Sequence, residues 1–162
     1  MIIYEVEITQ EMVSNAKILA DELGVLNNSI RNGTGNLAGF LGEECVLKCF
    51  KTARRDNDYN HDILYNSNRI EVKTKDRTVV PNPDFECSIP SYNTKQNTDI
   101  YVFVSLLRKN DAYVKGFLLG YMRKEEYFKK AKLLKKGEID TSNNFEVKAD
   151  CWNLKIKDLH SF

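Results

Sequence analysis

The residues best suited to chemistry lie in the stretch HDILYNSNRIEVKTKD, residues 61–76. Apolar and polar residues alternate on both sides of residues 66–68, which predicts two short antiparallel strands joined by a turn. Asp62 opens the first strand. Glu71 and Lys73 share one face of the second, because side chains two apart in a strand point the same way. The pattern therefore brings two carboxylates and one ammonium group together.

Two carboxylates held close to each other repel unless a cation lies between them. Hard oxygen ligands of this kind suit Mg²⁺, with Mn²⁺ as a substitute. A lysine beside the ion can position or help to deprotonate a water molecule, which then attacks a phosphodiester. The alternating charges of Asp62, Glu71 and Lys73 are also typical of an ordinary solvated strand, so a surface set of ion pairs is the other interpretation.

The spacing Asp62-(x)8-Glu71-Val72-Lys73, with an acidic helix upstream, resembles the signature of the PD-(D/E)XK nuclease superfamily. His61 stands where that signature usually has a proline. The resemblance implies that Asp62 and Glu71 are Mg²⁺ ligands, with the Val72 carbonyl as a third ligand. It also implies that Lys73 orients the attacking water and stabilises negative charge on the phosphate.

The acidic helix is predicted over residues 37–50. Glu43 falls on the same face as Phe40 and Leu47, and an acid on a buried face needs a partner. The resemblance implies that a helical glutamate before the hairpin contributes to the metal site. We assign this role to Glu43, with Glu44 as the second candidate. The alternative is that Glu43 lies at the boundary of the core and has no functional role.

Other residues are candidates for contacts with DNA. Cations can neutralise phosphates, an aromatic ring can stack on a base, and an amide can bind a phosphate oxygen or a base edge. Arg31 lies in a polar loop over residues 27–36, and three more candidates lie in a proline-interrupted segment over residues 79–98. The predicted DNA contacts are Arg31, Lys75, Arg77, Tyr92, Lys95 and Gln96. Ordinary polar surface residues are the alternative for each.

The resemblance covers roughly residues 37–136 and implies an α/β fold with a restriction-endonuclease-like core, a central mixed β-sheet flanked by helices. We expect one domain, in which residues 1–36 form a strand and helix appendage and residues 137–162 add C-terminal strands. Alternation and apolar stripes predict the remaining elements. These are a strand over residues 2–8, a helix from Thr9 to Gly24, a buried strand over 99–107, a strand over 113–122, a helix over 123–136, and strands over 145–147 and 151–156.

Composition limits the function classes. With 162 residues, 42% of them hydrophobic, the chain can bury one good core and hardly two. A net charge of +1 gives no overall basic footprint, so DNA contacts must come from local clusters. No apolar run is long enough to span a membrane, and the N-terminal residues are acidic, so we expect a cytoplasmic protein. Four cysteines are expected as reduced thiols; the spacing of Cys45 and Cys49 matches no standard zinc module.

Together these patterns predict a Mg²⁺-dependent DNA endonuclease that cuts internally. Restriction, homing-type and Holliday-junction-resolving enzymes are all compatible with the resemblance. A catalytically inactive nucleic-acid-binding module of the same fold is a further alternative, and an interaction protein without a metal is another. We expect a homodimer or higher oligomer, because cutting both strands of a duplex needs two sites.

Overall fold

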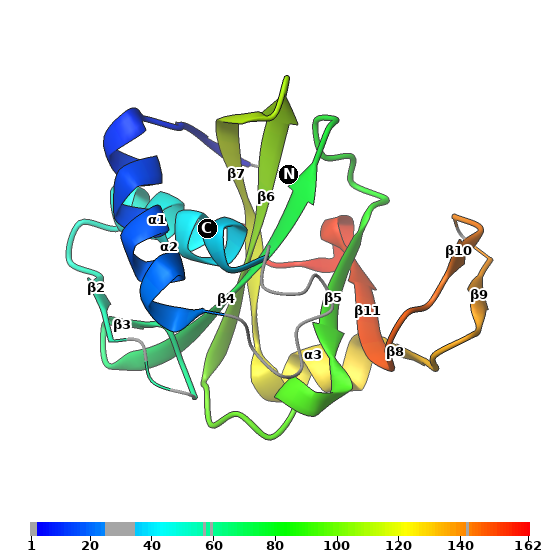
Figure 1. The fold of residues 1–162 in the computed structure, drawn as a ribbon. Coiled ribbons are helices and arrows are strands. Elements are labelled where there is room, and N and C mark those ends of the chain that lie inside the picture. The colour runs from blue at the N-terminus through cyan, green and yellow to red at the C-terminus, as the bar shows by residue number, and fades with distance from the viewer. Residues whose placement is uncertain (1–2, 25–34, 57, 59, 142) are drawn as a thin grey trace.

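The computed structural model describes residues 3–24, 35–56, 58, 60–141 and 143–162. Its centre is a curled, mixed sheet of six strands (Figure 1). In spatial order the strands are β1 (Tyr4–Glu7), β7 (Ala112–Arg123), β6 (Ile100–Lys109), β4 (Asn68–Arg77), β3 (Ile63–Tyr65) and β2 (Arg54–Arg55). Only β4 and β6 run parallel; the other neighbours are antiparallel. The expected α/β class with a central mixed sheet is confirmed.

Two helices cover one face of this sheet, α1 (Gln10–Leu23) and α2 (Gly35–Cys49) (Figure 1). Thr9 caps α1 by accepting a hydrogen bond from the Met12 amide, and Gly24 ends the helix, as the sequence predicts. The strand and helix expected as an N-terminal appendage are integrated into the fold. β1 forms one edge of the central sheet and α1 packs against α2.

The other face carries a second, three-stranded sheet and a short helix. In spatial order the strands are β5 (Glu86–Pro90), β11 (Cys151–Lys155) and β8 (Lys132–Leu134), and the helix is α3 (Lys124–Lys130). Tyr127 ties α3 to this sheet, since its buried hydroxyl donates hydrogen bonds to the carbonyls of Cys87 and Trp152 at 2.9 and 2.8 Å. A projecting hairpin of β9 (Ile139–Asp140) and β10 (Phe145–Glu146) lies beyond β8.

Side chains of β6 alternate between two hydrophobic cores, one under the helices and one under the three-stranded sheet. Val102, Val104 and Leu106 enter the first, whereas Tyr101 and Phe103 enter the second. The strand is therefore buried on both faces, as its almost wholly apolar sequence predicts. The turn expected at Asn110 and Asp111 connects it to β7, and both residues have left-handed φ angles.

Three predicted elements differ from the structure. The helix expected over residues 123–136 is wrong in its second half, because Ala131 takes an extended conformation and residues 132–134 pair with β11. The segment over residues 79–98 is not only loop; it contains β5 and a 3₁₀ turn, Ser91–Asn93. The charged connector over residues 51–60 contains β2, which pairs with β3.

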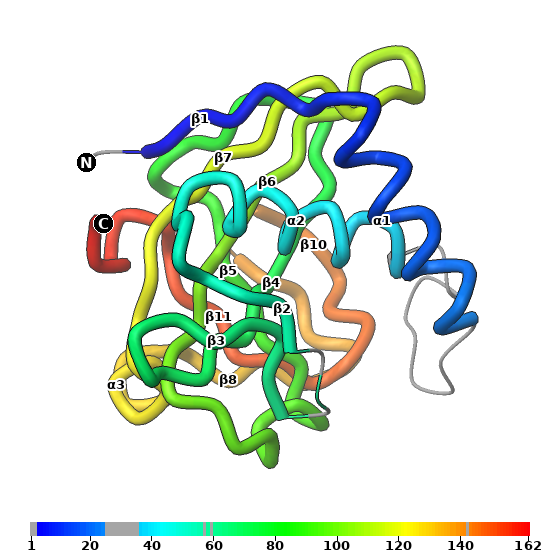
Figure 2. Tube along the Cα trace, turned by 90° about the vertical axis from the view of Figure 1, so that its left-hand side faces the viewer, coloured from blue at the N-terminus to red at the C-terminus, as the bar shows by residue number. Residues whose placement is uncertain are grey.

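The two ends of the described chain meet on one side of the molecule (Figure 2). The rings of Tyr4 and Phe162 lie 6.0 Å apart, centre to centre, and Phe162 also contacts Phe50 and Tyr121. A 3₁₀ turn, Ile156–Asp158, precedes this C-terminal contact. Among the described residues, no helix combines the length and apolar character needed to cross a membrane.

Candidate functional site

The hairpin of β3 and β4 fixes Asp62 opposite Glu71. Its turn residues Asn66 and Ser67 have φ angles of 48° and 63°, as a tight two-residue hairpin turn requires. The Asp62 amide donates to the Ile70 carbonyl at 2.9 Å, which continues the ladder of the hairpin. The predicted hairpin is therefore confirmed, and it places the two acidic residues side by side at the same end.

The Asp62 side chain is fastened to β4. Its Oδ2 accepts a hydrogen bond of 2.8 Å from the Val72 amide. Since the N–H and C=O of one strand residue lie on the same edge of the strand, the Val72 carbonyl also faces the Asp62 side. The third ligand implied by the resemblance is thus on the correct edge of β4.

Helix α2 brings Glu43 to this hairpin. Gly42 lies so close to Thr74 of β4 that a Cβ at position 42 would overlap the threonine side chain. This close approach buries the Glu43 side chain, which is 5% exposed. Burial raises the pKa of Glu43 to about 9, and the negative charge of Asp62 adds to the effect, while Arg55 lowers it. The inward position predicted for Glu43 is confirmed.

The charge of Glu71 acts on Asp62 in the same way. Burial and then the charge of Glu71 raise the pKa of Asp62 to about 7, whereas the Val72 amide and Lys73 lower it. The Glu71 side chain is buried too, and its Oε2 has no hydrogen-bond partner among the described residues. The charges of Asp62 and Glu71 both also raise the pKa of Glu43, so the three carboxylates lie near enough to repel one another.

Lys73 lies directly beside this cluster, on the same face of β4 as Glu71. Its Nζ donates a hydrogen bond of 2.8 Å to Glu71 Oε1. On the neighbouring strand, Tyr101 pairs with Glu71 in register, and its buried hydroxyl has no partner among the described residues. Burial and the charge of Glu71 raise the pKa of Tyr101. Tyr101 was not predicted, since its place beside Glu71 follows from the pairing of β4 with β6.

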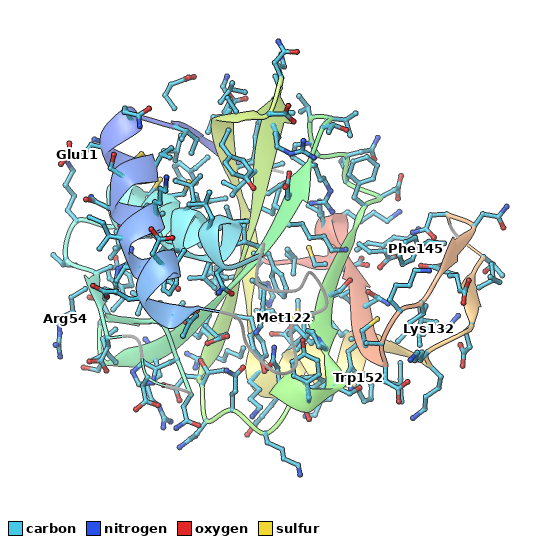
Figure 3. All side chains as sticks on the ribbon, in the orientation of Figure 1. Glu11, Arg54, Met122, Lys132, Phe145 and Trp152 are labelled. Carbon is cyan, nitrogen blue, oxygen red and sulfur yellow. The ribbon has the colours of Figure 1, made fainter. Side chains whose placement is uncertain are left out.

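Arg55 is the main residue of the site that the sequence did not indicate. From β2, its guanidinium binds Glu43 and also Glu44, the latter at 2.5 Å. Glu44, the second candidate for the metal site, is therefore held by the same cation as Glu43. The neighbouring Arg54 is exposed, and Figure 3 shows it at the outer rim of the sheet. Nothing in the short connector sequence distinguishes the two arginines.

The donor chemistry fits a hard divalent cation. Three carboxylates and a backbone carbonyl provide oxygen ligands of the kind that Mg²⁺ accepts. One of these oxygens, Glu71 Oε2, has no hydrogen-bond partner among the described residues and is therefore available to a cation. Within the described part of the chain, however, no group of three or more His, Cys, Asp or Glu side chains is arranged to enclose a metal. Arg55 and Lys73 instead neutralise Glu43 and Glu71.

The groups considered for zinc lie in separate environments. All four cysteines are free, and Cys45 is fully buried against Gly116. His61 is 2.8 Å from Asp56, and His160 is 2.8 Å from Glu126. Among the described residues, no third His, Cys, Asp or Glu joins Cys45 and Cys49 in a group that could hold a metal.

The residues predicted to contact DNA are only partly brought together. Lys75, Arg77 and Tyr92 line one cleft, which adjoins Lys73. Lys95 is exposed but does not line that cleft. Gln96 is buried, at 7% exposure, so it does not present its side chain to a ligand in the cleft. The last predicted contact, Arg31, lies outside the described residues.

Comparison of the chain with models of known protein families gives no match, and a search of curated proteins gives none either. The likeness to the PD-(D/E)XK signature therefore rests on the residues of the hairpin and of α2 alone.

Proposed function

We propose that the protein is a divalent-cation-dependent deoxyribonuclease. The observation that carries this proposal is that three neighbouring carboxylates, Glu43, Asp62 and Glu71, are partly or fully buried, and that burial and repulsion raise the pKa values of the first two. Such an arrangement costs folding free energy, and perturbed acids of this kind concentrate at functional sites. A bound cation would offset the repulsion between the carboxylates and so would account for their arrangement.

The residues divide into ligands and a positioning group. Asp62, Glu71 and the Val72 carbonyl hold the cation, and Glu43 completes the site. A Mg²⁺ ion held there supplies Lewis acidity toward a phosphate oxygen and lowers the pKa of a water molecule. Lys73 lies 2.8 Å from Glu71, where its ammonium group can orient the attacking water and stabilise the charge that develops on the phosphate.

A purely structural ion-pair cluster is the rival from another class. The contacts of Arg55 with Glu43 and of Lys73 with Glu71 favour it, because two of the three carboxylates then have a cationic partner within the chain. The two proposals differ in one measurable respect: only the nuclease requires a divalent cation.

The test combines metal binding with DNA cleavage. Mn²⁺ binding to the purified protein is measured by calorimetry, and cleavage is measured on supercoiled plasmid and on a four-way junction in Mg²⁺, Mn²⁺ or EDTA. We expect Glu71→Gln to lose both metal binding and cleavage. Lys73→Ala is expected to retain Mn²⁺ binding while cleavage falls by about 100-fold to 1,000-fold, the usual effect of removing one transition-state donor.

Lys115→Ala is the matched control, because Lys115 is also a strand lysine in an ion pair with glutamate, but its partners are the exposed Glu5 and Glu7 of the edge strand β1. It should behave as the unsubstituted protein. Absence of Mn²⁺ binding, or cleavage that continues in EDTA, would reject the proposal. Preferential cutting of the junction would identify a structure-selective nuclease, and retention of DNA without cutting would identify an inactive binding module.

A further inference from the structure

A cleft of about 820 Å³ lies beside β4, between the central sheet and the three-stranded sheet. Five consecutive residues of β4, Lys73 to Arg77, line it. Successive side chains of a strand point to opposite faces, so consecutive residues share a cleft only where it runs along the strand's edge. Within the described part of the chain, no strand pairs with that edge beyond Ile70, because β3 pairs only with residues 68–70 of β4. The cleft begins at Lys73 and therefore adjoins the carboxylate cluster.

The cleft is rich in cations. Five Lys or Arg side chains line it against three Asp or Glu. Lys75 and Arg77 point one way along β4, and both donate hydrogen bonds of 3.0 Å to the Glu86 carbonyl. Each keeps further N–H donors for a ligand, because a lysine has three and an arginine five. Burial and the neighbouring Arg77 lower the pKa of Lys75, and an anion placed beside it would favour its charged form.

Aromatic and amide groups complete the walls. Two exposed rings line the cleft. Tyr92, at 41% exposure, comes from the 3₁₀ turn after β5, and Phe145, at 54% exposure, comes from β10. Figure 3 shows Phe145 on the hairpin that projects beside the three-stranded sheet. Asn93, which follows Tyr92 in the chain, and Asn143, two residues before Phe145, also line the cleft. Rings on which bases stack, with amides at hand for base edges, are typical of sites for unpaired nucleotides.

The size of the cleft selects among nucleic acids. Its volume falls within the range of about 300 to 1,000 Å³ that is usual for sites of small ligands. A duplex cannot enter such a space, because its major groove alone is about 12 Å wide. Unstacked bases on a single strand can enter. Cations that follow the strand edge provide the electrostatic track that a single backbone requires.

We propose that this cleft binds a single-stranded nucleic-acid segment that leads away from the phosphate held at Glu71 and Lys73. The segment's phosphates lie along Lys75 and Arg77, and its bases stack on Tyr92 and Phe145. This inference rests on the proposed nuclease function and deepens it, since it makes an unpaired strand the substrate beside the scissile bond.

Binding is tested without cleavage, by fluorescence anisotropy in EDTA. The probes are a fluorescein-labelled 10-nucleotide single-stranded DNA, the RNA of the same sequence, and the corresponding DNA duplex. We expect at least tenfold tighter binding of a single strand than of the duplex. The two single strands decide which sugar the cleft prefers.

Substitutions at the rim of the cleft leave the packed core intact. Tyr92→Ala and Phe145→Ala should each weaken single-strand binding by about 5-fold to 100-fold, as expected when one stacking ring is removed. Lys148→Ala removes an exposed cation of the cleft. The plot of log affinity against log salt concentration should therefore become less steep, by about 0.7 in slope.

The matched controls lie outside the cleft. Ile139→Ala changes a residue of the same hairpin as Phe145 with nearly equal exposure, 53%, and Lys17→Ala changes an exposed lysine of α1. Both should bind as the unsubstituted protein does. Equal or tighter binding of the duplex, or rim variants that bind normally, would overturn the inference.

The two proposals fail in different ways. Metal-dependent plasmid cleavage with no effect of the rim substitutions on single-strand binding retains the nuclease and rejects the cleft. Single-strand binding that depends on Tyr92, Phe145 and Lys148, without any metal-dependent cleavage, retains the cleft and rejects the nuclease.

Discussion

At the scale of single residues, the site is an arrangement of charges that would be unfavourable without partners. Glu43 is buried near Asp62, and Asp62 near Glu71, so the charge of Asp62 raises the pKa of Glu43 and the charge of Glu71 raises the pKa of both. Arg55 and Lys73 supply the compensating charges within the chain. A metal ion bound by these carboxylates would supply part of the positive charge and would leave Lys73 available for a phosphate.

Arg55→Gln tests how strongly the chain itself stabilises Glu43. Above about pH 9, where Glu43 is ionised in the folded protein, the substitution leaves a buried carboxylate without its cation. We expect the free energy of unfolding to fall there by about 3 kcal/mol, the lower end for broken buried ion pairs. Adding Glu43→Gln should recover most of this loss, because a neutral amide needs no counter-charge. Urea unfolding of the single and double variants measures the coupling.

Lys115→Gln is the surface comparison for Arg55→Gln. Lys115 pairs with two exposed glutamates of β1, and such exposed pairs contribute about 0–1 kcal/mol. If the losses from Arg55→Gln and Glu43→Gln simply add in the double variant, Arg55 does not compensate the charge of Glu43.

At the scale of elements, α2 positions Glu43 through its contact with β4. Gly42 faces Thr74 at a separation that leaves no room for a Cβ, whereas Gly39, one turn earlier on α2, has no described side chain or neighbouring backbone within 4 Å. The two glycines therefore make a matched pair within one helix. Only one of them is required by the packing of helix on sheet.

Gly42→Ala is expected to lower the free energy of unfolding by about 1–3 kcal/mol, because the added methyl group forces α2 away from β4. The displacement also moves Glu43, so metal-dependent cleavage should fall. Gly39→Ala should instead stabilise the protein by about 0.5–1 kcal/mol, the usual gain from removing a helical glycine. Urea unfolding and plasmid cleavage of both variants provide the measurements; equal effects at the two positions would refute the packing argument.

Elements whose pattern is local and long were predictable from the sequence. The apolar run of β6, the turn at Asn66 and the inward face of α2 each depend on neighbours a few residues away. The strand β8 was not predictable, because Leu133 and Leu134 continue the helical stripe of α3 and only pairing with β11 separates them from it. The alternation of Cys87 and Ile89 in β5 was obscured by the surrounding prolines.

The site shows the same division between local and distant information. Asp62, Glu71 and Lys73 could be placed together because one hairpin carries them. Arg55 could not be added, since its contact with Glu43 depends on β2 joining the sheet and α2 crossing it. A two-residue strand is too short to show alternation. The cleft likewise depends on the distant pairing of β5 with β11.

At the scale of the whole molecule, the acidic cluster and the cationic cleft lie at one open edge between two layers. Side chains of β4 alternate between the helical face and the face of the three-stranded sheet, so α2 reaches the cluster from one side and β5 borders the cleft from the other. The acidic cluster suits a cation, and the cationic cleft suits a chain of phosphates.

The acidic cluster also predicts how the stability of the whole protein depends on pH. The folded-state pKa values of Glu43 and Asp62 are raised, to about 9 and about 7, so the folded protein binds more protons than the unfolded chain above pH 4. In metal-free solution the free energy of unfolding should therefore fall as pH rises from about 5 to about 9. Urea unfolding in EDTA at several pH values measures this fall.

Divalent cations should reverse this loss, and increasingly so at high pH, because they bind the ionised carboxylates. A Mg²⁺ concentration 100 times the dissociation constant adds about 2.7 kcal/mol to the free energy of unfolding. Glu43→Gln removes one titrating acid without changing its shape, so this variant should be more stable than the unsubstituted protein at pH 9 in EDTA and should gain less from Mg²⁺. An identical pH dependence in the variant would mean that Glu43 is not the acid whose ionisation destabilises the metal-free fold.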